Sequence, residues 1–238
     1  MAAQRDQANV PEIVRKVGRP RADEKRRGKD PRHEIMVVAA HLFSVHGYEG
    51  TQLNQIAAEA GLRTPSIYYY FAGKDEIRRA LSAYAVDQSA AFATDMLTEG
   101  GRAAVKLHRL LVTHVGRLTS GPYDLWFLIE LPGPLRSEPA PIEAMYLAWR
   151  RSVVALVEKA VEEGDFRPTG LKFALHMIIG CVHGAMELRH INRPAAPEQI
   201  ADFIIRAFAA DSGKAEEIQR TATSGPHAPE ASPPDLKA

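Results

Sequence analysis

The sequence predicts an all-α fold. Apolar residues recur at spacings of three and four through most of the chain, and no stretch keeps the alternating period of a β-strand for long. Glycine and proline interrupt this pattern where helices would end. These features predict roughly nine helices, over residues 31–46, 52–60, 65–71, 74–97, 103–119, 124–131, 139–163, 170–190 and 197–210.

The first predicted helix, 31–46, is followed by two short helices around a glycine turn. Gly47 ends the first helix and Gly61 turns the chain between the short ones, because glycine tolerates backbone conformations that other residues avoid. Thr51 can cap the second helix by accepting a backbone N–H. The inward faces of the first two helices are expected to be Ile35, Ala39, Leu42, Phe43, Leu53, Ile56 and Ala57.

The third predicted helix carries three consecutive tyrosines. Thr64 can cap it, and Pro65 takes its first position, where the missing N–H costs nothing. Ile67 and Phe71, four residues apart, would anchor one face to the domain. The side chains left outward are Ser66, Tyr69 and Tyr70, with Tyr68 at the margin.

Two short helices around a tight turn form a helix-turn-helix, whose second helix enters the major groove of DNA. Outward tyrosines suit this role, because phenol hydroxyls can bond phosphate oxygens while the rings contact thymine methyls and sugars. The alternative is that the rings pack against neighbouring helices, but so short a core helix rarely buries three phenols whose hydroxyls need partners. We therefore expect sequence-specific binding to double-stranded DNA.

Lys74 opens the next predicted helix, where its charge opposes the helix dipole. A cation at this end suggests an external anion such as a DNA phosphate. The alternative is a solvated lysine that is balanced by the neighbouring Asp75 and Glu76.

The strings LFSVHGYEGT, QIAAEAGL and IYYYF follow one another between Arg32 and Lys74. In this register they resemble the tetracycline-repressor (TetR/AcrR) family of bacterial transcriptional regulators. The resemblance implies that Thr51 and Lys74 hold phosphates and that Tyr68 meets the DNA backbone. Arg63 departs from the small capping residue common in the family, so either the cap shifts to Thr64 or Arg63 itself contacts DNA. The residues implied to face bases and sugars are Thr64, Pro65, Ser66, Tyr69 and Tyr70.

Charge is divided unevenly along the chain. The formal net charge is +1, yet residues 1–80 carry 14 Lys and Arg against 10 Asp and Glu, which leaves the remainder at −3. A basic N-terminal part suits a polyanionic partner. Residues 15–32 are too polar to fold alone and form either a solubilising tail or an arm that enters the minor groove. The predicted organisation is a disordered basic arm (1–30), a DNA-binding domain (31–76), a helical effector-binding and dimerisation domain (77–211) and a disordered tail (212–238).

Composition limits other possibilities. The single cysteine, Cys181, excludes an internal disulfide framework. The N-terminal segment lacks the apolar core of a signal peptide, and no uninterrupted run of about eighteen apolar residues predicts a membrane span. His176 and His183 share a helix face, but without a placed carboxylate they do not indicate a metal site. We expect a cytoplasmic protein with no membrane association, no metal and no cofactor.

The predicted helix at 170–190 combines large apolar residues with small ones. Small residues let another helix approach closely, so this helix and the last could form a four-helix interface across a twofold axis. The alternative is an ordinary core helix; a homodimer is favoured because one short recognition helix rarely supplies enough specificity. The predicted interface residues are Leu175, Ile178, Val182, Gly184, Met186, Phe203, Ile204 and Phe208.

Two predicted helices of the body carry large apolar and aromatic residues that could wall a cavity, as bundles do around apolar ligands. The residues alone slightly favour a filled core, whereas the resemblance implies a site for a small-molecule effector. The polar residues that could orient such a ligand are His114, Glu130, Arg150 and His176. The other predicted pocket residues are Phe92, Leu110, Trp126, Ile129, Tyr146, Trp149, Val153 and Met177.

Together these features predict a repressor that a small, largely apolar effector releases from a near-palindromic operator by shifting the population between two spacings of the heads. Two other classes stay open. One is a helical DNA-binding architectural protein without an effector. The other is an α-helical enzyme, although the sequence has no phosphate-binding glycine loop, HExxH, CxxC pair or GxSxG motif.

Overall fold

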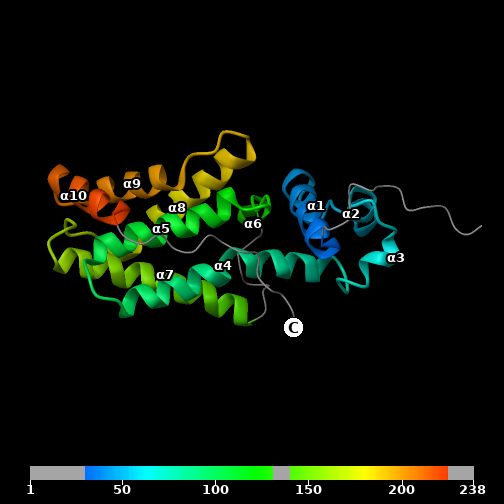
Figure 1. Ribbon diagram of the computed structural model, residues 1–238, viewed down its shortest axis with the longest axis horizontal. Helices are drawn as coiled ribbons and strands as arrows, with labels where there is room; N and C mark the ends of the chain where they lie inside the picture. The colour runs from blue at the N-terminus through cyan, green and yellow to red at the C-terminus, as the bar shows by residue number, and fades with distance from the viewer. Residues whose placement is uncertain (1–29, 131–139, 225–238) are drawn as a thin grey trace, which may run out of the picture.

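The computed structural model describes residues 30–130 and 140–224, and its regular elements in these ranges are all helices, which confirms the all-α prediction (Figure 1). Three helices, α1 (Pro31–His46), α2 (Leu53–Glu59) and α3 (Thr64–Ile67), form a head at one end of an elongated molecule. The predicted basic arm lies outside the described residues, apart from Asp30. The remaining helices are α4 (Lys74–Thr98), α5 (Ala103–Ser120), α6 (Phe127–Glu130), α7 (Ala140–Glu162), α8 (Leu171–His190), α9 (Pro197–Phe208) and α10 (Ser212–Thr223).

Local capping explains where the helices of the head begin. Asp30 caps α1 by accepting a hydrogen bond from the Arg32 backbone N–H at 3.0 Å. The cap of α2 is Gln52 and not Thr51, and the Gln55 side chain accepts from the Gln52 N–H at 2.7 Å. The cap of α3 is Arg63, without a side-chain hydrogen bond, so α3 starts at Thr64 and not at Pro65. Both predicted caps were therefore wrong by one residue.

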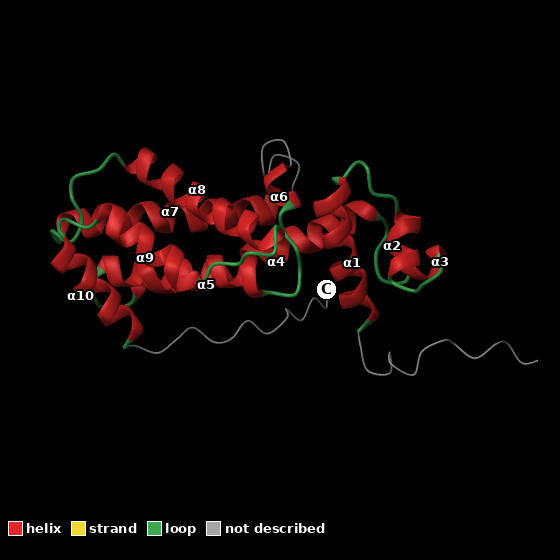
Figure 2. Ribbon diagram, turned by 90° about the horizontal axis from the view of Figure 1, so that it is seen from above, coloured by secondary structure: helices red, strands yellow, loops and turns green. Residues whose placement is uncertain are grey.

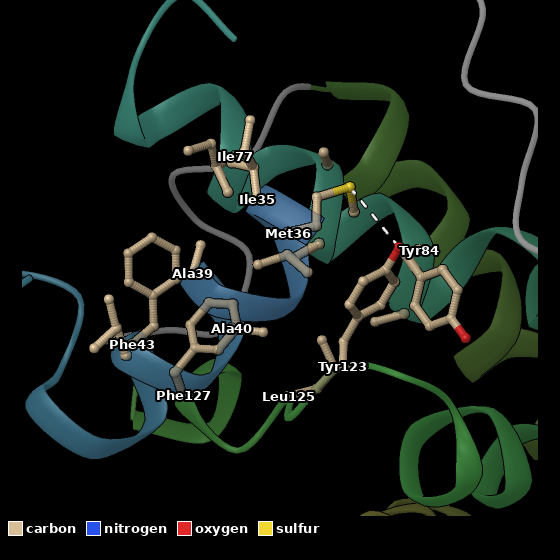
Figure 3. Packing of buried hydrophobic residues seen from close by; sticks show 14 of the residues in the cluster. Ile35, Met36, Ala39, Ala40, Phe43, Ile77, Tyr84, Tyr123, Leu125 and Phe127 are labelled. Carbon is tan, nitrogen blue, oxygen red and sulfur yellow. Dashed lines mark hydrogen bonds between the residues drawn. The ribbon is translucent and has the colours of Figure 1, made fainter. Parts of the chain in front are cut away.

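A continuous apolar core joins the head to the body. Figure 3 shows α1 residues packed against α4 and against the segment that precedes α6. The rings of Tyr84 and Tyr123 meet edge to face with centroids 4.6 Å apart, and those of Phe43 and Phe127 meet at 5.2 Å. Because aromatic side chains from both parts interdigitate, a displacement of the body at this point would also displace the head.

The body is a bundle in which α4, α5 and α7 run along the long axis (Figures 1 and 2). α4 begins in the head and packs along α7, and α5 packs against α7 and α9. α8 and α9 lie together along one edge of the body (Figure 1). The helix predicted from residue 124 begins three residues later, since α6 (Phe127–Glu130) starts at Phe127.

The prediction of a disordered tail from residue 212 is wrong for its first part, because Ser212–Thr223 forms α10. Asp211 caps this helix by accepting from the Lys214 N–H at 2.8 Å. Ala215, Ile218 and Ala222 are buried at helical spacing. Two of these three are alanines in a polar segment, so the apolar stripe is weak in the sequence and needs α5 and α9 to give it a partner. The rest of the predicted tail, 225–238, lies outside the described residues.

A buried carboxylate fastens α10 to the bundle. Asp165 is 1% exposed and pairs with Arg102 (Nη2 to Oδ1, 2.5 Å; Nε to Oδ2, 2.9 Å) and with Lys214 (Nζ to Oδ1, 3.3 Å). Arg102 also pairs with Glu217 of α10 at 2.7 Å. Burial alone would raise the pKa of Asp165, but the hydrogen bonds from Arg102 and Lys214 outweigh it and hold that pKa below its usual value.

We expect Asp165→Asn to lower the free energy of unfolding by about 2–3 kcal/mol, because it weakens buried hydrogen bonds to charged groups, while Arg102 keeps Glu217 as a partner. Urea denaturation measures the change. Glu162→Gln is the control, since the Glu162–Lys159 pair (3.0 Å) is mostly exposed and its loss should not change stability measurably. Equal effects of the two substitutions would contradict a special role for Asp165.

Candidate DNA-binding face and ligand cavity

The tyrosines after α3 divide into an outward pair and an inward one. Tyr69 is 88% exposed and Tyr68 is 59% exposed, whereas Tyr70 is partly buried against the core of the head. Ile67 and Phe71 are buried, as predicted. The sequence therefore placed Tyr69 correctly but exchanged Tyr68 and Tyr70. The reason is that α3 ends at Ile67 and residues 68–70 form a turn, so helical periodicity no longer gives their direction.

The other predicted contact residues, Arg63 and the first three residues of α3, are all at least partly exposed. Arg63 and Pro65 are exposed, and Thr64 and Ser66 are half-buried. Arg63 is in an extended conformation at the start of α3, so the cap does not shift to Thr64. The other alternative for Arg63 is a contact with DNA, and its exposed side chain is compatible with that contact.

Thr51 does not have the position expected of a cap or a phosphate ligand. It is 1% exposed, and its hydroxyl lies 3.1 Å from the Leu42 carbonyl oxygen and 2.9 Å from that of Gly47. These contacts fasten the start of the α2 segment to the end of α1. The prediction that Thr51 caps α2 is wrong, and its burial argues against the phosphate contact.

Lys74 has partners inside the head. Its Nζ donates to the carbonyl oxygens of Tyr48 (2.7 Å) and Thr51 (2.9 Å) and lies 4.3 Å from the centroid of the Tyr48 ring. The Tyr48 hydroxyl in turn donates to Asp75 at 2.6 Å. Burial, and then this hydrogen bond, raise the pKa of Tyr48 to about 12. The cation at this helix end therefore needs no external anion, and a phosphate contact by Lys74 stays a prediction from the resemblance.

We expect Thr51→Val to cost about 1–2 kcal/mol of unfolding free energy, because the isosteric change removes a buried hydrogen-bond donor. Affinity of the folded variant for DNA should be unchanged. Thermal and urea denaturation, together with DNA titration well below the melting temperature, test this. Thr223→Val at the exposed end of α10 is the matched control. Loss of DNA affinity without loss of stability would instead support a phosphate contact by Thr51.

A partly open cavity of about 80 Å³ lies in the body, between five helices from α4 to α8. Four predicted pocket residues line it, and so do Val182 and Met186, which were predicted at a dimer interface. The structure adds residues that the sequence analysis did not select, chiefly from α4 and α8. The full lining is Ser82, Ala85, Val86, His114, Leu118, Leu128, Ile129, Tyr146, Trp149, Ile179, Val182, His183 and Met186.

Among the residues whose side chains the structure describes, the other predicted pocket residues do not line the cavity. Leu110 and Val153 are buried in a hydrophobic cluster of the body, and Phe92 packs against that cluster. Trp126 stacks on His190 at 5.6 Å, and Arg150 lies 5.5 Å from the Tyr146 ring. His176 and Met177 are exposed on the outer side of α8, so His176 is turned away from the cavity that His183 lines. The side chain of Glu130 lies outside the described part of the structure.

His114 is the most buried titratable group of the cavity. Its ring lies 4.3 Å from the Trp149 ring, between centroids, and it is 6% exposed. Burial, followed by the charge of Arg117 and by His183, lowers the pKa of His114 to about 3. Burial also lowers the pKa of His183. The imidazole of His114 is therefore neutral at pH 7.

This burial should make the protein less stable in mild acid. The unfolded chain binds a proton at His114 below about pH 6.5, while the folded chain does so only near pH 3, so the stabilising contribution is complete above pH 6.5 and falls as the pH drops. We expect this group to lower the free energy of unfolding by about 1 kcal/mol between pH 6.5 and 5.5. Urea denaturation at both pH values should show that His114→Phe removes this part of the pH dependence. Trp149→Phe, which alters packing without removing a titratable group, should retain it, and equal pH dependence in wild type and His114→Phe would contradict the assignment.

The predicted dimer residues mostly face the core of their own subunit. Leu175, Ile178, Val182, Met186, Ile204 and Phe208 are buried within the subunit. Their assignment to an interface is wrong, because the apolar stripe of α8 is wide enough to have an inner and an outer side. Phe203 is 63% exposed, as an interface residue should be, and Gly184 is half-buried.

An apolar face remains uncovered on α8 and α9. Phe173 is 62% exposed and Met177 47%, on the side of α8 that also carries the exposed Gly180, and Phe203 lies on α9. Both helices that were predicted to form the dimer interface therefore carry exposed apolar residues, and the interface itself stays a prediction.

By length and composition alone α8 could cross a membrane, a test that core helices of soluble proteins also pass. The sequence analysis did not predict a membrane span here, because α8 contains no uninterrupted run of about eighteen apolar residues. A third of its apolar window (33%) is buried inside the subunit.

The fold is that of a helix-turn-helix protein. Its recognition helix is exposed at the end of a helical body, and that body contains a cavity. Residues 35–81 match the family profile described as bacterial regulatory proteins, tetR family. The regulator LmrA of Bacillus subtilis is 47% identical over 47 residues, which is 20% of this chain and 25% of LmrA. The repressor KstR2 of Mycobacterium tuberculosis is 26% identical over 139 residues, 58% of this chain and 70% of KstR2.

The solved structure of Mycobacterium smegmatis AmtR superposes with a TM-score of 0.70 and 29% identity, over 86% of this chain and 99% of AmtR. The similarity thus continues from the head through the body, while the match to LmrA spans only a quarter of that relative. The head therefore matches the tetR family of bacterial regulatory proteins, and the similarity to KstR2 and AmtR extends into the body.

Proposed function

We propose that this protein is a homodimeric transcriptional repressor that binds a near-palindromic DNA site with its two heads and leaves it when a small molecule fills the body cavity. The observation that carries the DNA-binding part is the Tyr68–Tyr69 pair. These two large aromatic side chains stay exposed in the turn that follows α3, while Ile67 before them and Phe71 after them are buried. A folded domain rarely leaves such side chains in water without a partner.

The uncovered face of α8 and α9 supports the dimer. Phe173, Met177 and Phe203 form an apolar surface, and Gly180 allows a second helix to approach closely. A second copy of the same two helices would complete a four-helix interface. Two heads related by a twofold axis would meet successive major-groove faces about 34–36 Å apart.

The segment before α6 supports coupling between cavity and head. The Ser44 hydroxyl on α1 lies 3.3 Å from the Asp124 carbonyl oxygen and accepts from the Phe127 N–H at 3.2 Å. Tyr123 hydrogen-bonds to His33 of α1 at 2.9 Å. The next residues of α6, Leu128 and Ile129, line the cavity. A ligand that displaces α6 would therefore also displace α1, and its effect on DNA affinity equals its differential affinity for the two arrangements.

Fluorescence anisotropy tests the DNA-binding part of the proposal. Duplexes selected from random sequence, and the DNA upstream of the protein's own gene, are titrated at several salt concentrations. We expect a near-palindromic consensus and an affinity that falls steeply with salt. If purified protein selects no sequence above background and shows no salt-dependent binding, the proposal is wrong.

A further inference from the structure

The segment between α5 and α6, residues 121–126, is held from two sides, and Asp124 takes part in both. On the side of the head, the Ser44 hydroxyl of α1 lies 3.3 Å from the Asp124 carbonyl oxygen. On the side of the body, Nδ1 of His190, the last residue of α8, lies 2.9 Å from Asp124 Oδ2. The other carboxylate oxygen, Oδ1, accepts from the Trp126 backbone N–H at 3.2 Å, which orients the side chain. One residue therefore connects the end of α8 to the first helix of the head.

The contact at His190 is built from more than one interaction. The Trp126 ring stacks on the imidazole, with centroids 5.6 Å apart and planes 12° from parallel. The preceding residue, Arg189, donates to the carbonyl oxygen of Thr119 near the end of α5. Because the side chains of His190 and Asp124 are only 25% and 20% exposed, water competes less for the bond between them than it would at the surface. The end of α8 is therefore held to this segment in one orientation.

The outward apolar face of the body lies on the same helix as His190. Phe173 and Met177 are exposed on α8, on the face that is proposed to meet a second subunit. α8 is one helix of 20 residues without a proline, so its two ends move together. A second subunit that fixes α8 therefore also fixes the position of His190, and Asp124 passes this constraint on to α1.

We infer that the bond between His190 and Asp124 is a latch that holds the head in one orientation relative to α8. In a dimer this latch fixes the spacing of the two heads and so selects the separation of the two half-sites on DNA. His190 is then a positioning residue, which acts on recognition through Asp124 and α1. This second part rests on the proposed function, whereas the orientation of the head can be measured without DNA and within one subunit.

Pulsed dipolar electron resonance tests the latch without DNA. Spin labels are attached to the head at Glu59→Cys of α2 and to the body at Glu158→Cys of α7, two exposed positions, in a Cys181→Ser background. An excess of unlabelled protein ensures that each distance is measured within one subunit. We expect one narrow distribution of distances between the two labels in this background.

Two substitutions of His190 separate its hydrogen bond from its stacking. His190→Phe keeps a ring beside Trp126 but removes the donor, so we expect a distribution of distances about twofold broader. His190→Asn has an amide N–H in the place of Nδ1 but no ring, so it should keep the narrow distribution. Asp124→Ala removes the same bond from the other side and should also broaden the distribution, which decides the question if His190→Phe does not fold.

Anisotropy titrations with altered DNA test the effect on spacing. One duplex carries two half-sites at the preferred separation, and a second has one base pair inserted between them, which turns one half-site by about 34° relative to the other. His190→Phe should reduce the preference for the first duplex over the second by about threefold. Its affinity for a duplex with a single half-site should equal that of the wild type, because the head itself is unchanged.

His108→Phe is the matched control. Nε2 of His108 lies 2.8 Å from Oδ1 of Asp202, so this pair has the same chemistry as the latch but joins α5 to α9 within the body. The variant should change neither the width of the distance distribution nor the preference between the two duplexes. Circular dichroism checks that each variant keeps its helical content.

A distribution in His190→Phe as narrow as in the background protein, or equal broadening by His108→Phe, would overturn the latch. Equal broadening by His190→Asn and His190→Phe would assign the effect to the stacked ring and not to the bond. The proposed function fails separately. If the wild type selects no palindrome while His190→Phe broadens the distribution, the latch stands and the proposed function is wrong. If wild type and His190→Phe distinguish the two duplexes equally, the proposed function stands and the latch does not set the spacing.

Discussion

Tyr69→Ala should weaken binding to the preferred DNA sequence by about 1–3 kcal/mol per head, or roughly 5- to 150-fold, while the free energy of unfolding stays the same. The side chain is 88% exposed, so its removal creates no cavity and exposes no core. Any loss of affinity therefore belongs to the interface. Anisotropy titrations with preferred and scrambled duplexes should show that discrimination between them decreases.

Tyr70→Phe is the matched control for this experiment. Tyr70 is partly buried against the head, so removing its hydroxyl should have a smaller effect on DNA discrimination. If Tyr69→Ala binds preferred DNA as the wild type does, or if Tyr70→Phe has the larger effect, the recognition surface is not the one assigned to Tyr68 and Tyr69.

Phe203→Asp should convert the protein to a monomer and abolish detectable binding to a palindromic site. The charge would fall in the apolar face of α8 and α9, where desolvating an unpaired carboxylate opposes association. Since Phe203 is 63% exposed in one subunit, the monomer should keep its fold. Sedimentation equilibrium measures the mass, circular dichroism the helicity, and anisotropy the DNA affinity.

Leu147→Asp on α7 is the control, because Leu147 is an exposed apolar residue (42%) on a different helix. It should leave both dimerisation and DNA binding intact. A Phe203→Asp protein that still sediments as a dimer would rule out the α8–α9 face as the interface. A monomer that binds the palindrome with wild-type affinity would show that dimerisation is not needed for recognition.

In the head, local sequence signals determine where helices end, whereas tertiary packing determines which partners the polar side chains have. The ends of α1 could be predicted because Pro31 and Gly47 act within a few residues of themselves. The structural role of Thr51 could not be predicted, because its hydroxyl hydrogen-bonds to the carbonyl groups of Leu42 and Gly47 in the preceding helix and turn. The partners of Lys74 within the head could not be predicted either, since the carbonyl groups of Tyr48 and Thr51 are more than twenty residues away in sequence.

In the body, the local sequence likewise predicts the bounds of α8, but not which side of the helix faces the core. α8 was predicted with nearly correct bounds, yet most of its large apolar residues were assigned to the wrong side. Periodicity places Val182 and Met186 on one stripe but does not say whether a cavity, a core or a second subunit covers that stripe. α10 was missed because its buried stripe is mostly alanine, and only the Asp165 network and the neighbouring helices make its docking evident.

By itself, the sequence determined the helical class, the helix-turn-helix and the exposed Tyr69, because turns, caps and apolar spacing act over a few neighbouring residues. The tertiary structure alone decided which tyrosine turns inward, which side of α8 meets its own core, and that Trp149 and His114 share a cavity. The physical reason is that the rotation of each helix about its axis is set by packing against segments distant in the chain, which no local pattern records.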